Sequence, residues 1–131
     1  MHAVAIVGGS GSGKTTLITR LIRRFTAKGL RVAAIKHTHH ALNEERQGDT
    51  AAFEQEGAEP VILAADGEAV RYSAGLPPER FRFREPRDLL STLDVDLVLI
   101  EGFKSYAGWP VLHTPIGEEE AAAFVDRIRS S

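Results

Sequence analysis

The sequence predicts an α/β fold, namely a P-loop NTPase-type three-layer domain with a mainly parallel sheet and an appended antiparallel hairpin. Residues 3–7 form a continuous apolar run, as expected for a strand buried on both faces of a parallel sheet. A glycine-rich segment and a helical pattern follow directly. Residues 31–37 predict a second buried strand and complete a strand–helix–strand unit, whose crossover is almost always right-handed.

Two helices are predicted around the second strand. Glycine favours the end of a helix, so the first is predicted over residues 14–28 and ends before Gly29. Its apolar side chains recur at helical spacing, as Leu17, Ile18, Leu21, Ile22 and Phe25. Residues 39–47 are polar and irregular and predict a loop, and residues 49–56 predict a short helix that ends before Gly57.

The middle of the chain predicts the antiparallel addition to the sheet. Residues 61–65 and 69–73 flank the pair Asp66-Gly67, and such a pair between apolar runs is a strong hairpin signal. Residues 81–84 alternate between phenylalanine and arginine and predict an edge strand. These segments should therefore extend one side of the parallel sheet.

The last third of the chain predicts a return to the parallel pattern. A short helix opens at Pro86, since proline is favoured in the first helical turn. Residues 96–100 predict a buried strand, and residues 111–112 a last short one. Acids precede arginines over residues 118–129, which matches the dipole of a terminal helix.

Composition narrows the class of protein. A chain of 131 residues suits a single domain over residues 1–131, and 43% hydrophobic content is ordinary for a globular protein. The net charge of −2 gives no general attraction to nucleic acid or to anionic membranes. The chain has no cysteine, no run long enough for a membrane helix and no basic leader, so we expect a cytoplasmic protein.

The glycine-rich segment after the first strand has the P-loop pattern G-x-x-x-x-G-K-[ST], with Gly8, Gly13, Lys14 and Thr15 at the defining positions. Backbone N–H groups of such a loop and the following helix N-terminus bind phosphates. Lys14 would contact the β- and γ-phosphates, and the Thr15 hydroxyl would bind Mg²⁺. An incidental glycine-rich turn is the alternative, but strand, spacing and helix all agree with a nucleotide site.

A second acidic group is expected near the metal. Glu101 follows the apolar residues 97–100, which is the Walker B form, and ligands bind at this edge of open α/β sheets. It would hold Mg²⁺ through water or orient the attacking water, although a solvated strand end is the alternative. Asp96, at the other end of the strand, is expected to be structural. No [NT]-K-x-D guanine motif is present, so these residues leave GTP and ATP open.

Four segments together resemble one known family. They are the P-loop, Lys36-His37-Thr38-His39-His40, Asp49-Thr50 and Glu101-Gly102-Phe103-Lys104. The combination is similar to the molybdopterin-guanine dinucleotide biosynthesis protein B family (MobB), over roughly residues 3–104. Strands ending in K-H-x-H-H and E-G-F-K are much more specific than a P-loop.

The resemblance implies a GTP-binding accessory protein with weak Mg²⁺-dependent GTPase activity, usually a homodimer. It would assist a MobA-like guanylyltransferase that attaches GMP to molybdopterin, and molybdopterin is a further candidate ligand. Lys14 and Glu101 would be the catalytic residues, and Thr15, Asp49 and Glu101 would surround the metal. The family's nucleotide-binding residues correspond to Gly9, Ser10, Gly11, Ser12, Gly13, Lys14, Thr15 and Thr16.

The sequence departs from the family pattern at residues 42–46, where an aspartate-rich stretch is usual, and at Gly48-Asp49, which lacks the intervening lysine. Beyond Lys104 the chain is short, and residues 109–113 stand where a basic end to a strand would be usual. The histidines at positions 37, 39 and 40 suit a polar cleft beside the phosphates. Imidazole groups also bind Zn²⁺ or Ni²⁺, so a metal site is a second interpretation, and a solvated loop is a third.

Each of two groups of arginines has a structural interpretation and a functional one. Arg80, Arg82, Arg84 and Arg87 would protect a solvent-facing edge strand, or bind a pterin phosphate or an acidic partner. Arg20, Arg23 and Arg24 would form a solvated helix face rather than supply an arginine finger. Trp109 is expected in core or interface packing, with a partner for its indole N–H.

Two other functions fit the same residues. A P-loop small-molecule kinase would use the same loop, but it usually needs a lid and an acceptor site, and the segment between the second and last strands is small for a lid. A nucleotide-gated pterin carrier would need no significant catalysis. Slow hydrolysis is expected in the accessory protein, because no glutamine or arginine finger is evident to position the water.

Overall fold

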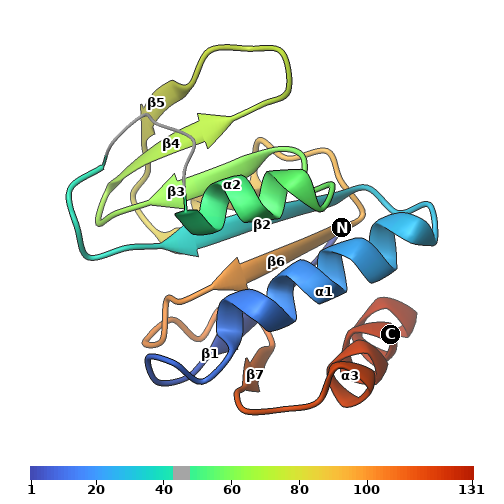
Figure 1. Ribbon diagram of the computed structural model, residues 1–131. Coiled ribbons are helices and arrows are strands. Elements are labelled where there is room, and N and C mark those ends of the chain that lie inside the picture. Colours follow the sequence, from blue (N-terminus) through green and yellow to red (C-terminus); the bar gives the residue numbers. More distant parts are fainter. Residues whose placement is uncertain (43–47) are drawn as a thin grey trace.

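The computed structural model describes residues 1–42 and 48–131 and contains a seven-stranded sheet in the order β5-β4-β3-β2-β6-β1-β7 (Figure 1). The strands β7, β1, β6, β2 and β3 are parallel, and β4 and β5 continue the sheet antiparallel. The strands are β1 His2–Val7, β2 Val32–His37, β3 Val61–Ala64, β4 Glu68–Tyr72, β5 Glu79–Arg82, β6 Leu97–Glu101 and β7 Val111–His113. The helices are α1 Lys14–Ala27, α2 Gly48–Gln55, the 3₁₀-helix η1 Pro86–Leu90 and α3 Glu118–Ser130.

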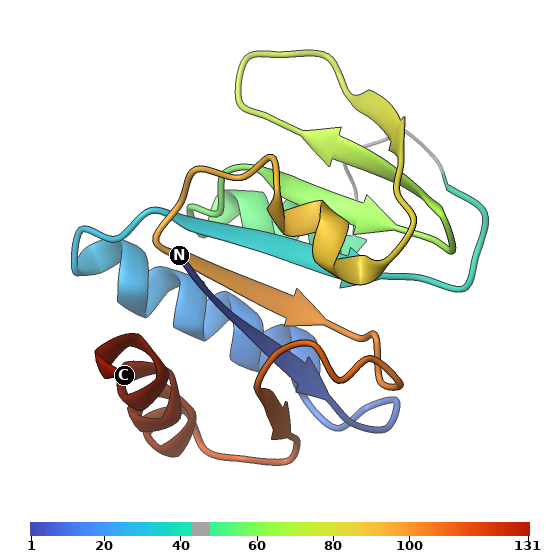
Figure 2. The same cartoon turned by 180° about the vertical axis from the view of Figure 1, so that it is seen from behind.

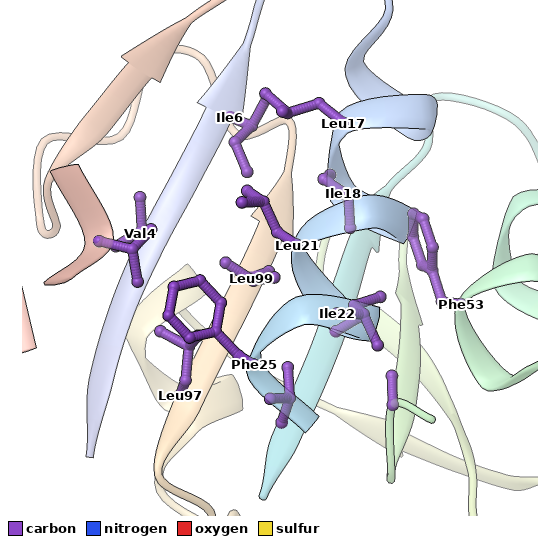
Figure 3. Packing of buried hydrophobic residues seen from close by; sticks show 14 of the residues in the cluster. Val4, Ile6, Leu17, Ile18, Leu21, Ile22, Phe25, Phe53, Leu97 and Leu99 are labelled. Atoms are coloured by element: carbon purple, nitrogen blue, oxygen red, sulfur yellow. The ribbon is translucent and has the colours of Figure 1, made fainter. Parts of the chain in front are cut away.

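The α-helices of the described residues lie on one face of the sheet, as Figure 1 shows. The apolar stripe of α1 packs against the central strands there and is buried (Figure 3). Phe25 of α1 and Phe53 of α2 are buried in this core, which also contains alternate residues of the strands, including Val4 and Leu99. The predicted amphipathic helix over residues 14–28 is therefore confirmed, and Gly29 ends it at a φ of 88°.

The opposite face of the sheet is covered by η1 and the segment over residues 102–110, as the view from behind shows (Figure 2). Leu89 of η1 packs there with Phe103 and Trp109, and all three are buried. The α/β fold with a mainly parallel sheet and an antiparallel hairpin is confirmed. The layer on this face consists of a 3₁₀-helix and a connecting segment.

The hairpin forms where it was predicted, with Ala64 opposite Ala69 and the turn at Asp66-Gly67. The edge strand is displaced: it covers Glu79–Arg82 and not residues 81–84. Pairing is limited by the partner strand, because β4 begins at Glu68 opposite Arg82. Within the described part of the chain, no helix is both long and apolar enough to cross a membrane.

Candidate nucleotide-binding site

The predicted P-loop connects β1 to α1 at the carboxyl edge of the parallel strands. Gly11 and Gly13 have φ values of 75° and 91°, a conformation that favours glycine. Gly13 is the residue that precedes α1, and no side chain caps the helix there. The first N–H groups of α1 are therefore available to an anion, which is the basis of phosphate binding at a helix N-terminus.

Close contacts hold the base of the loop. A Cβ atom on Gly8 would lie 2.0 Å from Thr114 Oγ1, so only glycine fits at this position. The hydroxyls of Ser12 and Thr114 lie 2.6 Å apart, and Thr114 Oγ1 also donates to the carbonyl of Val7 at 3.2 Å. Thr114 follows β7, so the last strand of the sheet helps to fix the loop.

The Lys14 side chain folds back over the P-loop, whose phosphate it would help to bind. Its Nζ donates to the carbonyl oxygens of Gly8 at 2.8 Å and Gly9 at 3.2 Å. The ammonium group of Lys14 therefore lies at the P-loop, next to the start of α1. The loop thus brings together the two kinds of donor that a triphosphate needs.

Glu101 lies directly opposite the start of α1. Thr15 Oγ1 donates to Glu101 Oε1 at 2.8 Å, although 86 residues separate the two in sequence. Glu101 is only 4% exposed, and the register pairs it with Ile6 on one side and Lys36 on the other. The strand-end acid therefore faces the P-loop.

Lys36 links Glu101 to Asp49. Its Nζ lies 2.6 Å from Asp49 Oδ2 and also donates to Glu101 Oε2. Burial alone lowers the pKa of the Lys36 ammonium, but the hydrogen bonds and charges of the two carboxylates together outweigh burial and raise this pKa above its usual value. The two predicted metal-binding acids are thus held together at the N-terminus of α2.

These groups fit the magnesium nucleotide that a P-loop implies. A threonine hydroxyl and two carboxylates are oxygen donors, and Mg²⁺ prefers such donors. Thr15, Asp49 and Glu101 contribute them within one connected network. Ser10, Lys14, Lys36 and Glu101 also border a cavity of about 770 Å³ that extends from the loop across the carboxyl ends of β2 and β6.

The histidines line that cavity from the other face of the sheet. Side chains alternate along a strand, so His37 points away from Lys36 and packs with Phe103, with ring centroids 4.1 Å apart. His37 Nε2 lies 3.1 Å from Asp66 Oδ1, and the His39 ring lies 4.7 Å from that of His37. Across residues 1–42 and 48–131, no three His, Asp or Glu side chains are grouped to hold a metal ion. The polar-cleft role of the histidines stays a prediction.

Several predicted residues lie away from this network. Thr16 is exposed one position further along α1, and its carbonyl accepts a bond from Thr19. Asp96 lies at the opposite end of β6 and accepts a hydrogen bond from the Arg31 N–H, as expected for a structural residue. The 39–47 loop prediction and the departure noted at residues 42–46 fall mostly on residues 43–47, outside the described residues.

Three of the arginines singled out from the sequence, Arg23, Arg24 and Arg80, form ion pairs. Arg80 pairs with Glu68 at 2.8 Å on the edge of the sheet, and Arg23 pairs with Glu56 at 2.7 Å. Arg24 contacts two acids at the start of α3. The Trp109 side chain is buried as expected, but its indole N–H has no partner among the described residues, so that part of the prediction is wrong.

Sequence reasoning assigned no role to Lys36 or Thr114. A signal for Lys36 was present, because a charged residue in an otherwise apolar strand needs a partner when it is buried. The partners of Lys36 could not be predicted from the sequence, because Asp49 and Glu101 belong to other elements. Nothing in the sequence near Thr114 indicates that its side chain lies against Gly8.

Comparison with known proteins decides the family. The family model described as "Molybdopterin guanine dinucleotide synthesis protein B" (MobB) matches residues 3–120, which is most of the chain. The chain belongs to the MobB family. A "Molybdopterin-guanine dinucleotide biosynthesis adapter protein" from Haemophilus influenzae is 39% identical over 103 residues, and the one from Escherichia coli is 33% identical over 102 residues.

The MobB relatives are longer than this chain. The matches cover 77% of this chain but only 56% and 58% of the Haemophilus influenzae and Escherichia coli proteins. The crystal structure of Bacillus subtilis MobB agrees with the fold at a TM-score of 0.51 and 25% identity, covering 94% of this chain and 73% of that chain. The MobB fold is therefore shared.

Proposed function

We propose that this chain is a GTP-binding adapter in the formation of molybdopterin guanine dinucleotide, with slow Mg²⁺-dependent GTPase activity. One observation supports this most directly: the Thr15 hydroxyl of the P-loop is bonded to the buried Glu101 in a member of the MobB family. A P-loop threonine joined to a strand-end acid is the arrangement that magnesium nucleotides require.

Each residue has a distinct part in this function. Backbone N–H groups of residues 9–13 and the start of α1 would bind the phosphates, and Lys14 would exchange its loop carbonyls for phosphate oxygens. Thr15, Asp49 and Glu101 would hold Mg²⁺. The bound ion would neutralise the charge that develops on the phosphates during hydrolysis.

The choice of GTP follows from the family and from the guanine dinucleotide in the names of its members. Slow hydrolysis is expected because no described glutamine lines the cavity to orient a water. The adapter would act with a MobA-like guanylyltransferase and as a homodimer. Molybdopterin is a candidate for the part of the cavity beside the histidines.

The nucleotide site is tested by equilibrium binding of a fluorescent GTP analogue with Mg²⁺. We expect Lys14→Ala to weaken binding at least about tenfold, because a charge-assisted contact to the phosphates is lost. Lys28→Ala, at the far end of the same helix, is the matched control and should bind like the wild type. Equal affinity of Lys14→Ala and the wild type would contradict the assignment.

The preferred base and the role of the protein need three further measurements. Unlabelled GTP should displace the analogue at lower concentration than ATP, and a preference for ATP would overturn the choice of GTP while leaving the fold unaffected. Pull-down with a MobA-like guanylyltransferase separates an adapter from a free carrier. Transfer of phosphate to an added acceptor, rather than release to water, would instead indicate a kinase.

A further inference from the structure

The position of Lys36 suggests a role that the family assignment does not include. Its ammonium group lies between the Asp49 and Glu101 carboxylates, 2.6 Å from Asp49 Oδ2, and Glu101 is bonded in turn to Thr15. Thr15, Asp49 and Glu101 are the groups that would hold Mg²⁺. A protein cation therefore occupies the place between the metal ligands.

The register of the sheet fixes the position of this cation. Lys36 is opposite Glu101 in the parallel register of β2 and β6, so both side chains project to the helix-covered face. The Lys36 side chain is 24% exposed and that of Glu101 is 6% exposed. Two carboxylates this close repel each other, and burial strengthens the repulsion, so a counter-ion is needed to keep them together.

The net charge of the site determines how strongly it attracts a divalent ion. The two carboxylates and one ammonium group sum to −1, whereas the two carboxylates alone offer −2. An ion that binds beside Lys36 meets a like charge only a few ångströms away, which is strongly unfavourable at low dielectric. Lys36 also borders the cavity together with Lys14 and Ser10, so phosphates there offer it another anionic partner.

We propose that Lys36 is a built-in counter-ion for the metal-binding acids, which Mg²⁺ must displace and which moves to the phosphates when nucleotide is bound. This inference rests on the proposed function, since it concerns the same site. Lys36 would make the nucleotide-free protein a poor ligand for divalent ions. Metal and nucleotide would then bind together rather than separately.

The test measures Mn²⁺ binding to nucleotide-free protein by electron paramagnetic resonance. Lys36→Met removes the charge and keeps an apolar side chain of similar reach, and it should bind Mn²⁺ at least about tenfold tighter than the wild type. Lys36→Arg keeps the charge and should bind as weakly as the wild type. Lys28→Met, whose lysine pairs with Asp126 away from the site, is the matched control and should not change.

The folded state is followed by circular dichroism in the same samples. Lys36→Met is expected to lose stability without metal and to recover it with millimolar Mn²⁺, because the ion replaces the ammonium group. If Lys36→Met does not fold even with metal, Lys36→Gln takes its place. Mn²⁺ affinity that is no tighter in the uncharged variant than in the wild type would overturn the proposal.

This experiment contains no nucleotide, so it is independent of the test of the proposed function. A wild type that fails to bind GTP would contradict the nucleotide site but leave the Mn²⁺ comparison meaningful. Conversely, normal GTP binding with unchanged Mn²⁺ affinity in Lys36→Met would leave the nucleotide site in place. That result would mean that Lys36 has only a structural role, in its salt bridges with Asp49 and Glu101.

Discussion

At the scale of single residues, Gly102 shows how closely the backbone approaches the site. It follows Glu101 directly and has a φ of 105°, which side chains other than glycine rarely adopt. A Cβ atom built on it would lie 2.8 Å from the Cβ of His37. This glycine lets β6 end against β2, so that Glu101 and His37 border one cavity.

We expect Gly102→Ala to lower the free energy of unfolding by about 2 kcal/mol, because it combines backbone strain with a steric contact. Urea denaturation followed by circular dichroism measures the change. Gly9→Ala is the matched control, since a Cβ atom there meets nothing within 4 Å and should change stability little. Equal loss in both variants would refute this account of Gly102.

At the scale of elements, α3 is attached to α1 by charge as well as by packing. Ala121, Ala122 and Val125 bury the inner face of α3. Arg24 of α1 donates to both carboxylate oxygens of Glu119, at 2.8 and 2.9 Å, and to Glu118 at 3.2 Å. The Arg24 hydrogen bonds hold the pKa of Glu119 below its usual value.

This depressed pKa predicts a pH-dependent contribution of Arg24. A lowered folded-state pKa means that the pair stabilises the fold above the unfolded glutamate pKa of about 4.5 and that this contribution is lost as pH falls through the lower folded value. Arg24→Met should therefore lower Tm at pH 7, and its difference from the wild type should shrink toward pH 3.

Thermal unfolding at a series of pH values between 7 and 3 checks this expectation. Arg20→Met lies on the exposed face of the same helix and should leave Tm unchanged throughout. A Tm difference for Arg24→Met that stays constant down to pH 3 would show that packing of the arginine stem, rather than the ion pair, attaches α3.

At the scale of the whole molecule, the two faces of the sheet have different coverings. The α-helices pack on one face, whereas η1 and the segment over residues 102–110 cover the other (Figure 2). Aromatic side chains of that segment form a cluster. Trp109 is 7% exposed there, and its ring centroid lies 6.0 Å from that of Phe103 and 4.7 Å from that of Tyr106. The segment that leaves Glu101 is thus anchored by aromatic contacts.

We expect Trp109→Ala to destabilise the protein by about 3 kcal/mol, because it opens a cavity in this thinner layer. The free energy of unfolding in urea measures the effect. Leu76→Ala is the control, since Leu76 is 61% exposed and should contribute little. A loss below about 1 kcal/mol for Trp109→Ala would mean that the aromatic cluster is not part of the cooperative core.

The local chemistry of the site was readable from the sequence. Glycines at defined spacing, Lys14 and Thr15 predict a P-loop, and an apolar strand that ends in Glu101 predicts its acidic counterpart. The periodicity of apolar residues and the turn-forming pair Asp66-Gly67 also predicted the sheet and its hairpin. These patterns are readable because each depends on neighbours in the chain, within one strand, turn or helix.

Contacts between distant segments were decided only by the tertiary structure. The register of β2 against β6 places Lys36 beside Glu101, and it turns His37 to the other face of the sheet. The same folding brings Asp49 to Lys36 and Thr114 to Gly8. Sequence alone determined which chemical groups are present, and packing of the sheet determined which of them meet, because strand register and helix placement depend on the whole core.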